Sequence, residues 1–530
     1  MKTINKILMA CLALSSASCS KDLLEIKNEN QYNYTDYFTS PATIQQATNA
    51  VYAVFNNNGM WPREYYYDFD LLSFDVKREK PLLGSYLQLS DWAHNGTHLE
   101  LSQLWSGMYR LIARANLVLD RQPVVAATTT DATALATMNR NVAEAKFLRA
   151  YGRYHIAMLW GDAPMRKDLK SYTEEQFPGR APVAEIWAAV ETDLKEAIDV
   201  LPVTYGDKDL GRATKGAAIG LLGRAYMYQK KWADAQKTLD LITKAPYTYD
   251  LLPMAEWDFM FDDVAAHAAN KETIFQVMNK SWAVNDYALA NGWSAVFGGA
   301  ESAGKSSMSI RAQEYDFLGW NNTLLTTAAA KAFSYPWPGR DTLVKDPRGK
   351  VTFYGDAASA GATVYAEKTA TPTAFPFATK GYQLRKYGLN FAYPGATPYI
   401  TGVNGQIMRF SDALLLLAES YIQQGNTGTA PLDLINRVRN RAGAPLYTTL
   451  GDQTAAMAKI ELERKLELTG EQSRYFDLIR WGKYVATINA ERKAEGMTEP
   501  LEAKHVLLPI PNVEKDYNPI VNGAVKNGWN

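Results

Sequence analysis

The chain has 530 residues, enough for a large core, and its 47% apolar and 21% charged residues are typical of a globular protein. Basic and acidic residues balance to a formal net charge of +0. This balance argues against nucleic acid as a partner, because nucleic-acid binding usually requires a basic surplus. Both cysteines, Cys11 and Cys19, lie near the N-terminus, so the body of the chain is expected to have no disulfide, thiol chemistry or cysteine metal cluster.

Residues 1–18 are predicted to be a lipoprotein signal peptide. A positively charged start precedes an apolar run over residues 7–14, which is too short to span a bilayer. The small residues before Cys19 resemble a bacterial lipobox, in which the cysteine is acylated and becomes the new N-terminus. The resemblance implies a lipidated tether over residues 19–40, and residues 20–22 resemble the tag that directs such lipoproteins to the cell surface. A plain secretory signal is the alternative.

An N-terminal helical scaffold is predicted over residues 41–245. Pro41 starts the first helix, because proline suits the first helical position. Residues 60–100 are different, because they combine crowded aromatic residues with turn residues and show no helical period. We expect them to form loops that carry binding groups. Further helices are predicted over residues 101–119, 143–160 and 183–201, and a helix pair over residues 215–243.

A weak internal repeat indicates how these helices stack. Small and aromatic residues follow the spacing of a tetratricopeptide helix pair at two places, and part of the pattern occurs a third time. We therefore predict a mainly α fold, a right-handed scaffold of tetratricopeptide-like helix pairs. A large irregular, loop-rich insertion over residues 246–400 interrupts it, and the scaffold resumes over residues 401–530. The repeat residues are Gly223, Tyr226, Ala235 and Leu239, then Ala418, Tyr421, Ala430 and Leu434, and in part Leu194, Ala197 and Pro202.

Several sequence blocks, in order, resemble the SusD/RagB family of surface glycan-binding lipoproteins. The first is EAKFLRAYGRYHIAMLWGDAP at residues 144–164, and RFSDALLLLAESY follows at residues 409–421. ERKLEL and GEQSRYFDLIRWG lie at residues 463–482, and LPIP lies at residues 508–511. Because the blocks keep the family order over most of the chain, they support the resemblance together more strongly than any one block does.

The resemblance implies a function without catalysis and without a cofactor. It implies that the protein binds oligo- or polysaccharide at the outer surface of the outer membrane, anchored by lipid on Cys19 and facing the cell exterior. It also implies delivery of the glycan to a partner TonB-dependent transporter of the SusC type. Two alternatives stay open: a peptide-binding member of the same family, and a secreted glycoside hydrolase.

Candidate ligand residues come from the early loops and the insertion, the two regions that the resemblance indicates. Flat aromatic rings can stack on the apolar faces of sugars, while carboxylates, amides and guanidinium groups bond to the hydroxyls. Core packing is the competing interpretation for each aromatic residue. The candidates are Tyr66, Asp75, Arg78, Trp92, Asn95, Trp282, Trp293 and Trp320.

Other patterns give weaker indications of chemistry. Residues 299–306 match the nucleotide-binding loop G-x-x-x-x-G-K-[ST], but no βαβ alternation surrounds them. His94 and His98 have the spacing of helical zinc ligands, yet Asn-Gly separates them, so we predict no metal site. Asp68, Asp70 and Asp75 are expected to form hydrogen bonds rather than to catalyse hydrolysis. A charged C-terminal block is expected to be a buried ion network between helices. Its members are Arg464, Glu467, Arg474, Asp477 and Arg480.

Overall fold

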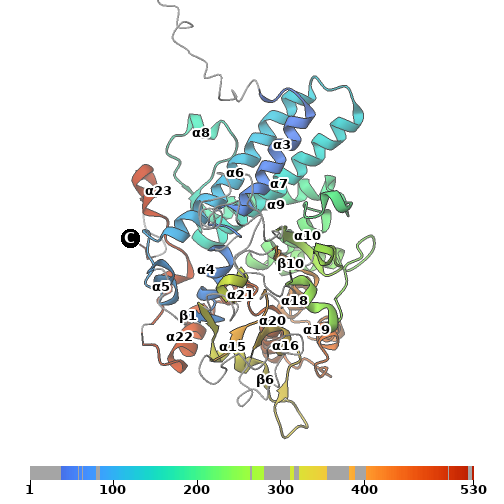
Figure 1. Ribbon diagram of the computed structural model, residues 1–530, viewed down its shortest axis with the longest axis vertical. Coiled ribbons are helices and arrows are strands. Elements are labelled where there is room, and N and C mark those ends of the chain that lie inside the picture. Colours follow the sequence, from blue (N-terminus) through green and yellow to red (C-terminus); the bar gives the residue numbers. More distant parts are fainter. Residues whose placement is uncertain are drawn as a thin grey trace, which may run out of the picture.

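The computed structural model is mainly helical, with its long helices packed side by side at one end (Figure 1). This confirms the predicted fold class. The predicted signal peptide, Cys19 and most of the tether lie outside the residues that the structure describes. The described residues are 37–57, 59–61, 64–78, 84–262, 265–279, 311–315, 322–354, 381–387, 402–498, 500–522 and 528–529.

The N-terminal helices agree with the predicted segments and extend several of them. The central helix starts at residue 132 rather than near 143, because the side chain of Asp131 caps it by accepting hydrogen bonds from two backbone N–H groups. It ends at Trp160 as predicted, and the next residue, Gly161, has φ of 69°. The helices are α3 (Pro41–Tyr52), α4 (Glu64–Leu72), α5 (Gly84–Ser90), α6 (Leu99–Ala126), α7 (Ala132–Trp160), α8 (Ser171–Glu174), α9 (Val183–Val200), α10 (Lys215–Tyr228) and α11 (Trp232–Leu241).

The C-terminal scaffold is helical, and the described part of the insertion contains short strands and short helices. The helices of the C-terminal scaffold are α18 (Phe410–Gln423), α19 (Thr429–Ala442), α20 (Gln453–Leu468), α21 (Ser473–Arg480), α22 (Tyr484–Ala494) and α23 (Asn512–Tyr517). The described helices of the insertion are α14 (Arg311–Tyr315), α15 (Thr327–Ala332) and α16 (Gly349–Thr352). The strands are β1 (Val76–Arg78), β2 (Ala163–Pro164), β3 (Arg180–Ala181), β4 (Thr273–Val277), β5 (Thr323–Leu325), β6 (Ser334–Tyr335), β7 (Val344–Lys345), β8 (Phe353–Tyr354), β9 (Gln383–Leu384) and β10 (Gly405–Arg409).

Successive helices form one continuous stack. Helix α9 packs on α7, α10 on α9, α11 on α10, and α18 on α11, so the stack continues across the insertion. The α10–α11 pair shows why its small residues matter. A Cβ atom added to Gly223 would lie 2.4 Å from Leu239 Cδ2, so the glycine lets the two helices approach closely. These contacts agree with the helix pairs that the repeat predicted.

Two antiparallel pairings attach the insertion to the scaffolds. Strand β4, at the start of the insertion, pairs with β10, which leads directly into α18. Strand β5, later in the insertion, pairs with β1, with Val76 opposite Leu325. Strand β1 lies within residues 60–100, which we name the early region. The insertion therefore contacts both scaffolds through backbone hydrogen bonds, although its sequence shows no sustained period.

A cluster of buried ion pairs, which we name the charged hub, joins the insertion to α19 and α20. Glu467 lies 3.0 Å from Arg409 and 3.2 Å from Arg348, and Glu463 lies 2.6 Å from Arg348 and 2.7 Å from Arg439. Opposite charges at these distances compensate much of the cost of removing them from water. The hub consists of Arg348, Lys386, Arg409, Arg439 and Arg441 with Glu272, Asp346, Glu463, Glu467 and Glu471.

The prediction that residues 60–100 form loops is wrong in part, because α4 and α5 lie within them. Every residue of α4 from Tyr65 to Leu72 is buried. A helix that is surrounded by protein on all sides needs no amphipathic period, so the periodicity that indicates a surface helix is missing from its sequence. Described turns lie between α4 and β1, and after α5 around Asn95 and Gly96.

Candidate functional site

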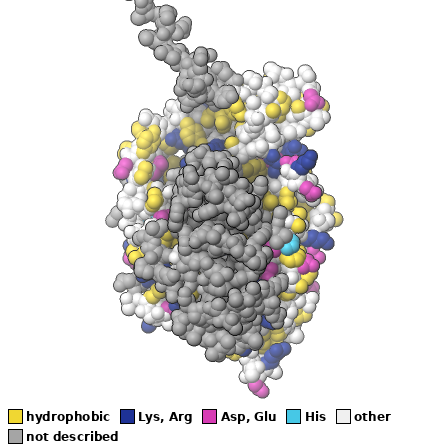
Figure 2. All heavy atoms as spheres, in the orientation of Figure 1, with side chains coloured by type: hydrophobic (Ala, Val, Ile, Leu, Met, Phe, Trp, Pro, Cys, Tyr) yellow, Lys and Arg dark blue, Asp and Glu magenta, His cyan; other side chains and the backbone are white. Residues whose placement is uncertain are grey.

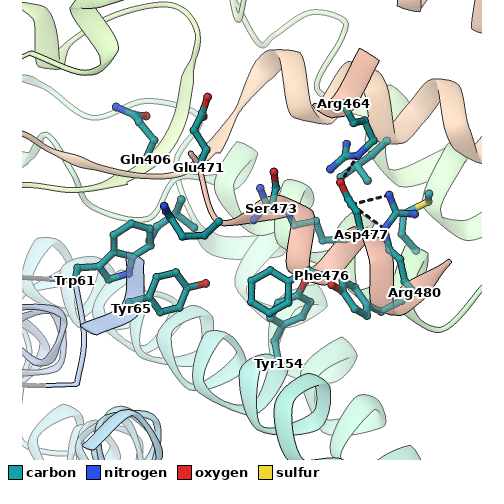
Figure 3. Close-up of a pocket in the computed structure, with 16 residues that line it drawn as sticks. Trp61, Tyr65, Tyr154, Gln406, Arg464, Glu471, Ser473, Phe476, Asp477 and Arg480 are labelled. Atoms are coloured by element: carbon teal, nitrogen blue, oxygen red, sulfur yellow. Dashed lines mark hydrogen bonds and ion pairs between the residues drawn. The ribbon is translucent and has the colours of Figure 1, made fainter. Parts of the chain in front are cut away.

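A small cavity lies where the N-terminal helices meet α20, α21 and β10. Figure 3 shows its lining, with Trp61 and Tyr65 on one side and Ser473 and Phe476 across from them. The rings of Trp61 and Tyr65 are stacked, with their centroids 4.5 Å apart. The cavity has a volume of about 50 Å³, which admits a few water molecules and is too small for a sugar ring.

Polar atoms without protein partners line this cavity. Among the described residues, the hydroxyl groups of Tyr228 and Ser473 and one guanidinium nitrogen of Arg464 are buried without a hydrogen-bond partner in the protein. Buried polar groups of this kind are commonly satisfied by ordered water. The size and the polarity of the cavity are therefore those of an internal water site between the two scaffolds.

Ion pairs close one side of the cavity. Asp477 lies 2.7 Å from Arg464 and 2.8 Å from Arg480, as the dashed lines in Figure 3 indicate. Burial tends to raise the pKa of Asp412, yet Arg224 and Arg464 lower that pKa to about 2, so this carboxylate is ionised at neutral pH. Together with Glu467 in the charged hub, these pairs confirm that the charged C-terminal block is a buried ion network.

Three of the predicted ligand residues lie inside the protein. Trp92 is 5% exposed, its Nε1 donates to the Tyr484 hydroxyl at 3.0 Å, and the Arg492 guanidinium lies 4.5 Å from its ring. Asp75 lies 3.4 Å from Arg474, and burial raises its pKa. Tyr66 is buried. The structure therefore does not support direct stacking or hydrogen bonding of these three side chains with a ligand, because protein groups already surround them.

Two predicted residues lie at the surface of the same region. The side chain of Arg78 is 33% exposed and lies 3.2 Å from Asp91. Asn95 is exposed, and its Oδ1 accepts hydrogen bonds from the backbone N–H and the hydroxyl of Thr97. Trp282, Trp293, Trp320 and the nucleotide-loop match at residues 299–306 lie outside the described residues, so the structure does not test them.

The carboxylate of Asp70 in α4 is held by groups from distant parts of the chain. Asp70 accepts hydrogen bonds from the Tyr315 hydroxyl at 2.8 Å and from Gln472 at 2.9 Å, and it lies 3.1 Å from Arg311. Burial raises the pKa of Asp70 to about 6 against the opposing effect of Arg311. Asp70 therefore anchors α14 and the start of α21 to α4. No sequence signal related Arg311 or Tyr315 to α4, because the contact spans more than 240 residues.

Two family models match consecutive parts of the chain, and these matches identify its family. The model described as "Starch-binding associating with outer membrane" matches residues 22–227. The model described as "SusD family" matches residues 258–527, which is half of the chain. The chain belongs to the SusD family.

Other proteins resemble the chain over nine-tenths or more of its length. "SusD-like protein P25" of Formosa agariphila is 25% identical over 100% of both chains. A crystal structure of a SusD superfamily protein from Bacteroides vulgatus has a TM-score of 0.75 at 22% identity and covers 92% of this chain and 99% of that one. Surface glycan-binding protein A from Bacteroides thetaiotaomicron, in complex with laminarihexaose, has a TM-score of 0.69 at 22% identity over 92% of this chain and 100% of its own. These likenesses establish the SusD-like fold, and no enzyme is named among them.

His94 and His98, the pair with the spacing of zinc ligands, are surrounded by other protein groups. His98 Nε2 donates to the Ser85 carbonyl at 2.8 Å, and its Nδ1 accepts from the backbone N–H of Leu101 at the start of α6. Burial lowers the pKa of His94 to about 3. In the described part of the chain no three His, Cys, Asp or Glu side chains are arranged to hold a metal ion.

Two further properties of the described residues are the distribution of surface charge and the hydropathy of the helices. In Figure 2 the described residues visible around the edge of the view carry interspersed basic and acidic side chains, and these described residues form no continuous basic patch there. None of the helices in the described ranges is both long and apolar enough to cross a membrane.

Proposed function

We propose that this protein binds oligo- or polysaccharide at the cell surface and delivers it, without catalysis, to a TonB-dependent transporter of the SusC type. The observation that carries the proposal is family membership along the chain, with two consecutive family matches over residues 22–227 and 258–527. The relatives of the same fold include proteins named for laminarin binding and for a laminarihexaose complex. The helical stack would dock the transporter, and the loops would hold the glycan between the two proteins.

The proposed ligand surface combines the exposed part of the early region with the insertion. Arg78 and Asn95 supply hydrogen-bonding groups at the surface, and Trp282, Trp293 and Trp320 supply stacking surfaces in the insertion. In the early region, buried Tyr66, Asp75 and Trp92 hold α4, β1 and α5 in place. In this proposal the buried residues fix the position of the surface and the exposed ones contact the sugar.

The chain is proposed to be attached to the outer membrane by lipid on Cys19, facing the cell exterior. Acyl chains contribute roughly 0.8 kcal/mol per buried methylene, so several chains on one cysteine give a stable anchor. A Cys19→Ser chain is expected to appear in the soluble fraction of fractionated cells instead of the membrane fraction. Retention of this variant in the membrane would contradict the anchor.

Binding without turnover is supported by the state of the carboxylates. Asp70 is enclosed by Arg311, Tyr315 and Gln472, and Asp477 is enclosed by two arginines. A glycoside hydrolase needs two carboxyl groups facing one accessible glycosidic bond. These carboxylates face protein groups instead.

The test is a binding panel on the soluble body from Ser20 onward. Plant, host and microbial glycans, with casein-type peptides beside them, are assayed by affinity gel electrophoresis. We expect retention on one class of glycan, and loss of that retention in Trp282→Ala, Trp293→Ala or Trp320→Ala while the thermal unfolding temperature is unchanged. Trp232→Ala is the matched control, because Trp232 lies on α11 of the helical stack. Binding to peptides alone would overturn the glycan proposal in favour of a peptide-binding function.

A second experiment tests the partner. The tagged chain is purified from mild-detergent extracts of outer membranes of the native host, and co-purifying proteins are identified by mass spectrometry. We expect a TonB-dependent transporter in stoichiometric amount. Its absence from the purified chain, with the glycan-binding activity retained, would contradict delivery to a transporter and leave surface binding in place.

A further inference from the structure

Two adjoining cavities lie between the N-terminal scaffold and the start of the insertion around β4, and they share no lining residue with the cavity of Figure 3. One has a volume of about 220 Å³ and the other of about 390 Å³. They share a wall formed by Leu210, Gly211 and Arg212 with Phe275 and Gln276 of β4. Each is several times larger than the water-sized cavity between the scaffolds.

Aromatic rings form much of the smaller cavity. Tyr247 and Tyr249 lie nearly parallel, with ring centroids 6.1 Å apart and 7° between their planes. The Tyr249 ring also stacks on Phe410, with ring centroids 6.0 Å apart, and this contact fixes its position. It also lies against Gly216, where an added Cβ would be 2.3 Å from its hydroxyl oxygen. Tyr247 is half-buried beside this fixed ring, so the pair offers a rigid apolar surface at the rim.

The charges around the cavities are paired within the protein. Arg212 lies 2.8 Å from Glu144 and 2.7 Å from Asp209, and it also donates to Asn49 at 2.8 Å. Among the described lining residues the remaining charged side chain is Lys208. An ionic ligand would find little net charge here, whereas a neutral molecule would meet aromatic faces and polar groups such as the exposed Thr204 and Thr248.

We propose that these two cavities form a second binding site for a neutral glycan segment, separate from the ligand surface proposed for Arg78, Asn95, Trp282, Trp293 and Trp320. Sugars combine apolar C–H faces with hydroxyl groups, which is the combination that parallel tyrosines with a polar, charge-compensated rim recognise. The proposal rests on the proposed function for the class of its ligand. A second site on one chain would hold a long polysaccharide more tightly than a short oligosaccharide, because the second contact is made at a high effective concentration.

The test uses the soluble body from Ser20 onward and the oligosaccharide of the class that it retains in the glycan panel. Calorimetry of the unchanged chain is expected to give two sites. Tyr247→Ala is expected to weaken one of them about tenfold, equal to about 1.4 kcal/mol. Leu210→Arg places a long charged side chain at the shared wall and is expected to abolish that site. Both substitutions are at partly exposed positions, so thermal unfolding temperatures are expected to stay within a few degrees.

Matched controls separate this site from general surface effects. Tyr517→Ala and Leu343→Arg change the same residue types at exposed positions outside the two cavities, and they are expected to leave both sites intact. A single site in the unchanged chain, undisturbed by Tyr247→Ala and Leu210→Arg but lost in the tryptophan variants of the insertion, would overturn the second site and keep the proposed function. No glycan binding at all would overturn both.

Discussion

The stack of helix pairs and the charged hub are stabilised in opposite ways. In the stack, helices approach through small residues, as Gly223 does against Leu239. In the hub, buried arginines and carboxylates connect the insertion to α19 and α20, as Arg348 does with Glu463 and Glu467. Close packing depends on volume, whereas buried ion pairs depend on every charge having its partner. The comparison teaches that a small change of shape should be worst in the stack, and a small change of charge worst in the hub.

The largest expected effect is in the hub. Glu467→Gln keeps the size of the side chain but removes the charge that faces Arg348, Arg409 and Arg441. Breaking a buried pair leaves uncompensated charge and costs about 3–5 kcal/mol. We expect the free energy of unfolding, measured by urea denaturation, to fall by that amount. The control is Glu461→Gln, because Glu461 pairs with a half-exposed Lys483 and should change stability by less than about 1 kcal/mol. Equal effects of the two changes would contradict the special role of the hub.

A change of volume tests the stack. Gly223→Val adds atoms where a Cβ already lies within 2.5 Å of the Leu239 side chain, and overpacking of this kind costs about 1–3 kcal/mol. The loss is expected in urea denaturation of the folded chain. Gly206→Val is the comparison, because no atom lies within 4 Å of a Cβ at Gly206. If the two substitutions lower the free energy of unfolding equally, close contact between the helices does not depend on Gly223.

A buried histidine makes the stack sensitive to acid. His155 Nδ1 donates to the Tyr151 carbonyl, so its Nε2 accepts from the Tyr65 hydroxyl, and the ring is held neutral. Burial lowers the pKa of His155 to about 3 from its usual 6.5. Between these two values the unfolded chain binds the proton and the folded chain does not, so stability falls as pH drops below 6.5. The contribution of this residue should fall by about 2 kcal/mol between pH 7 and pH 5.

His155→Gln isolates this contribution. Its stability relative to the unchanged chain should improve on going from pH 7 to pH 5, measured by urea denaturation at each pH. In contrast, the pKa of Asp412 is lowered to about 2 by its arginine partners, despite burial, so this ion pair should lose stability only in stronger acid. A pH profile that His155→Gln leaves unchanged would show that another group titrates first.

The smallest effect on stability is expected at the exposed residues of the early region. Arg78→Ala removes a pair with Asp91 in which both side chains are about one-third exposed, and such pairs contribute about 0–1 kcal/mol. We expect an unchanged thermal unfolding temperature together with weaker retention on the glycan in affinity electrophoresis. Asp91→Ala removes the same ion pair without removing Arg78. Equal loss of retention in both variants would assign the effect to the ion pair and not to contact between Arg78 and the ligand.

The periodic part of the chain could be predicted from the sequence, because a helix that packs on one side repeats its apolar residues every three or four positions. The α9, α10 and α11 segments were predicted in this way, and the resemblance identified the family. Helix α4 was missed because it is buried on all sides. The burial of Trp92 could not be foreseen either, since its partner Tyr484 lies 392 residues away. Contacts between distant segments leave no local pattern, so the burial of a single residue such as Trp92 cannot be predicted from the sequence around it.

The central claim is that the chain binds a glycan and releases it unchanged. Its most direct test is a calorimetric titration of the soluble body from Ser20 with the glycan identified in the panel, followed by chromatography of the recovered sugar. The account predicts saturable binding, full recovery of intact glycan, and loss of binding when Trp282, Trp293 and Trp320 are replaced by alanine together. Shortened oligosaccharides in the recovered sample, or no saturable binding to any glycan, would contradict it.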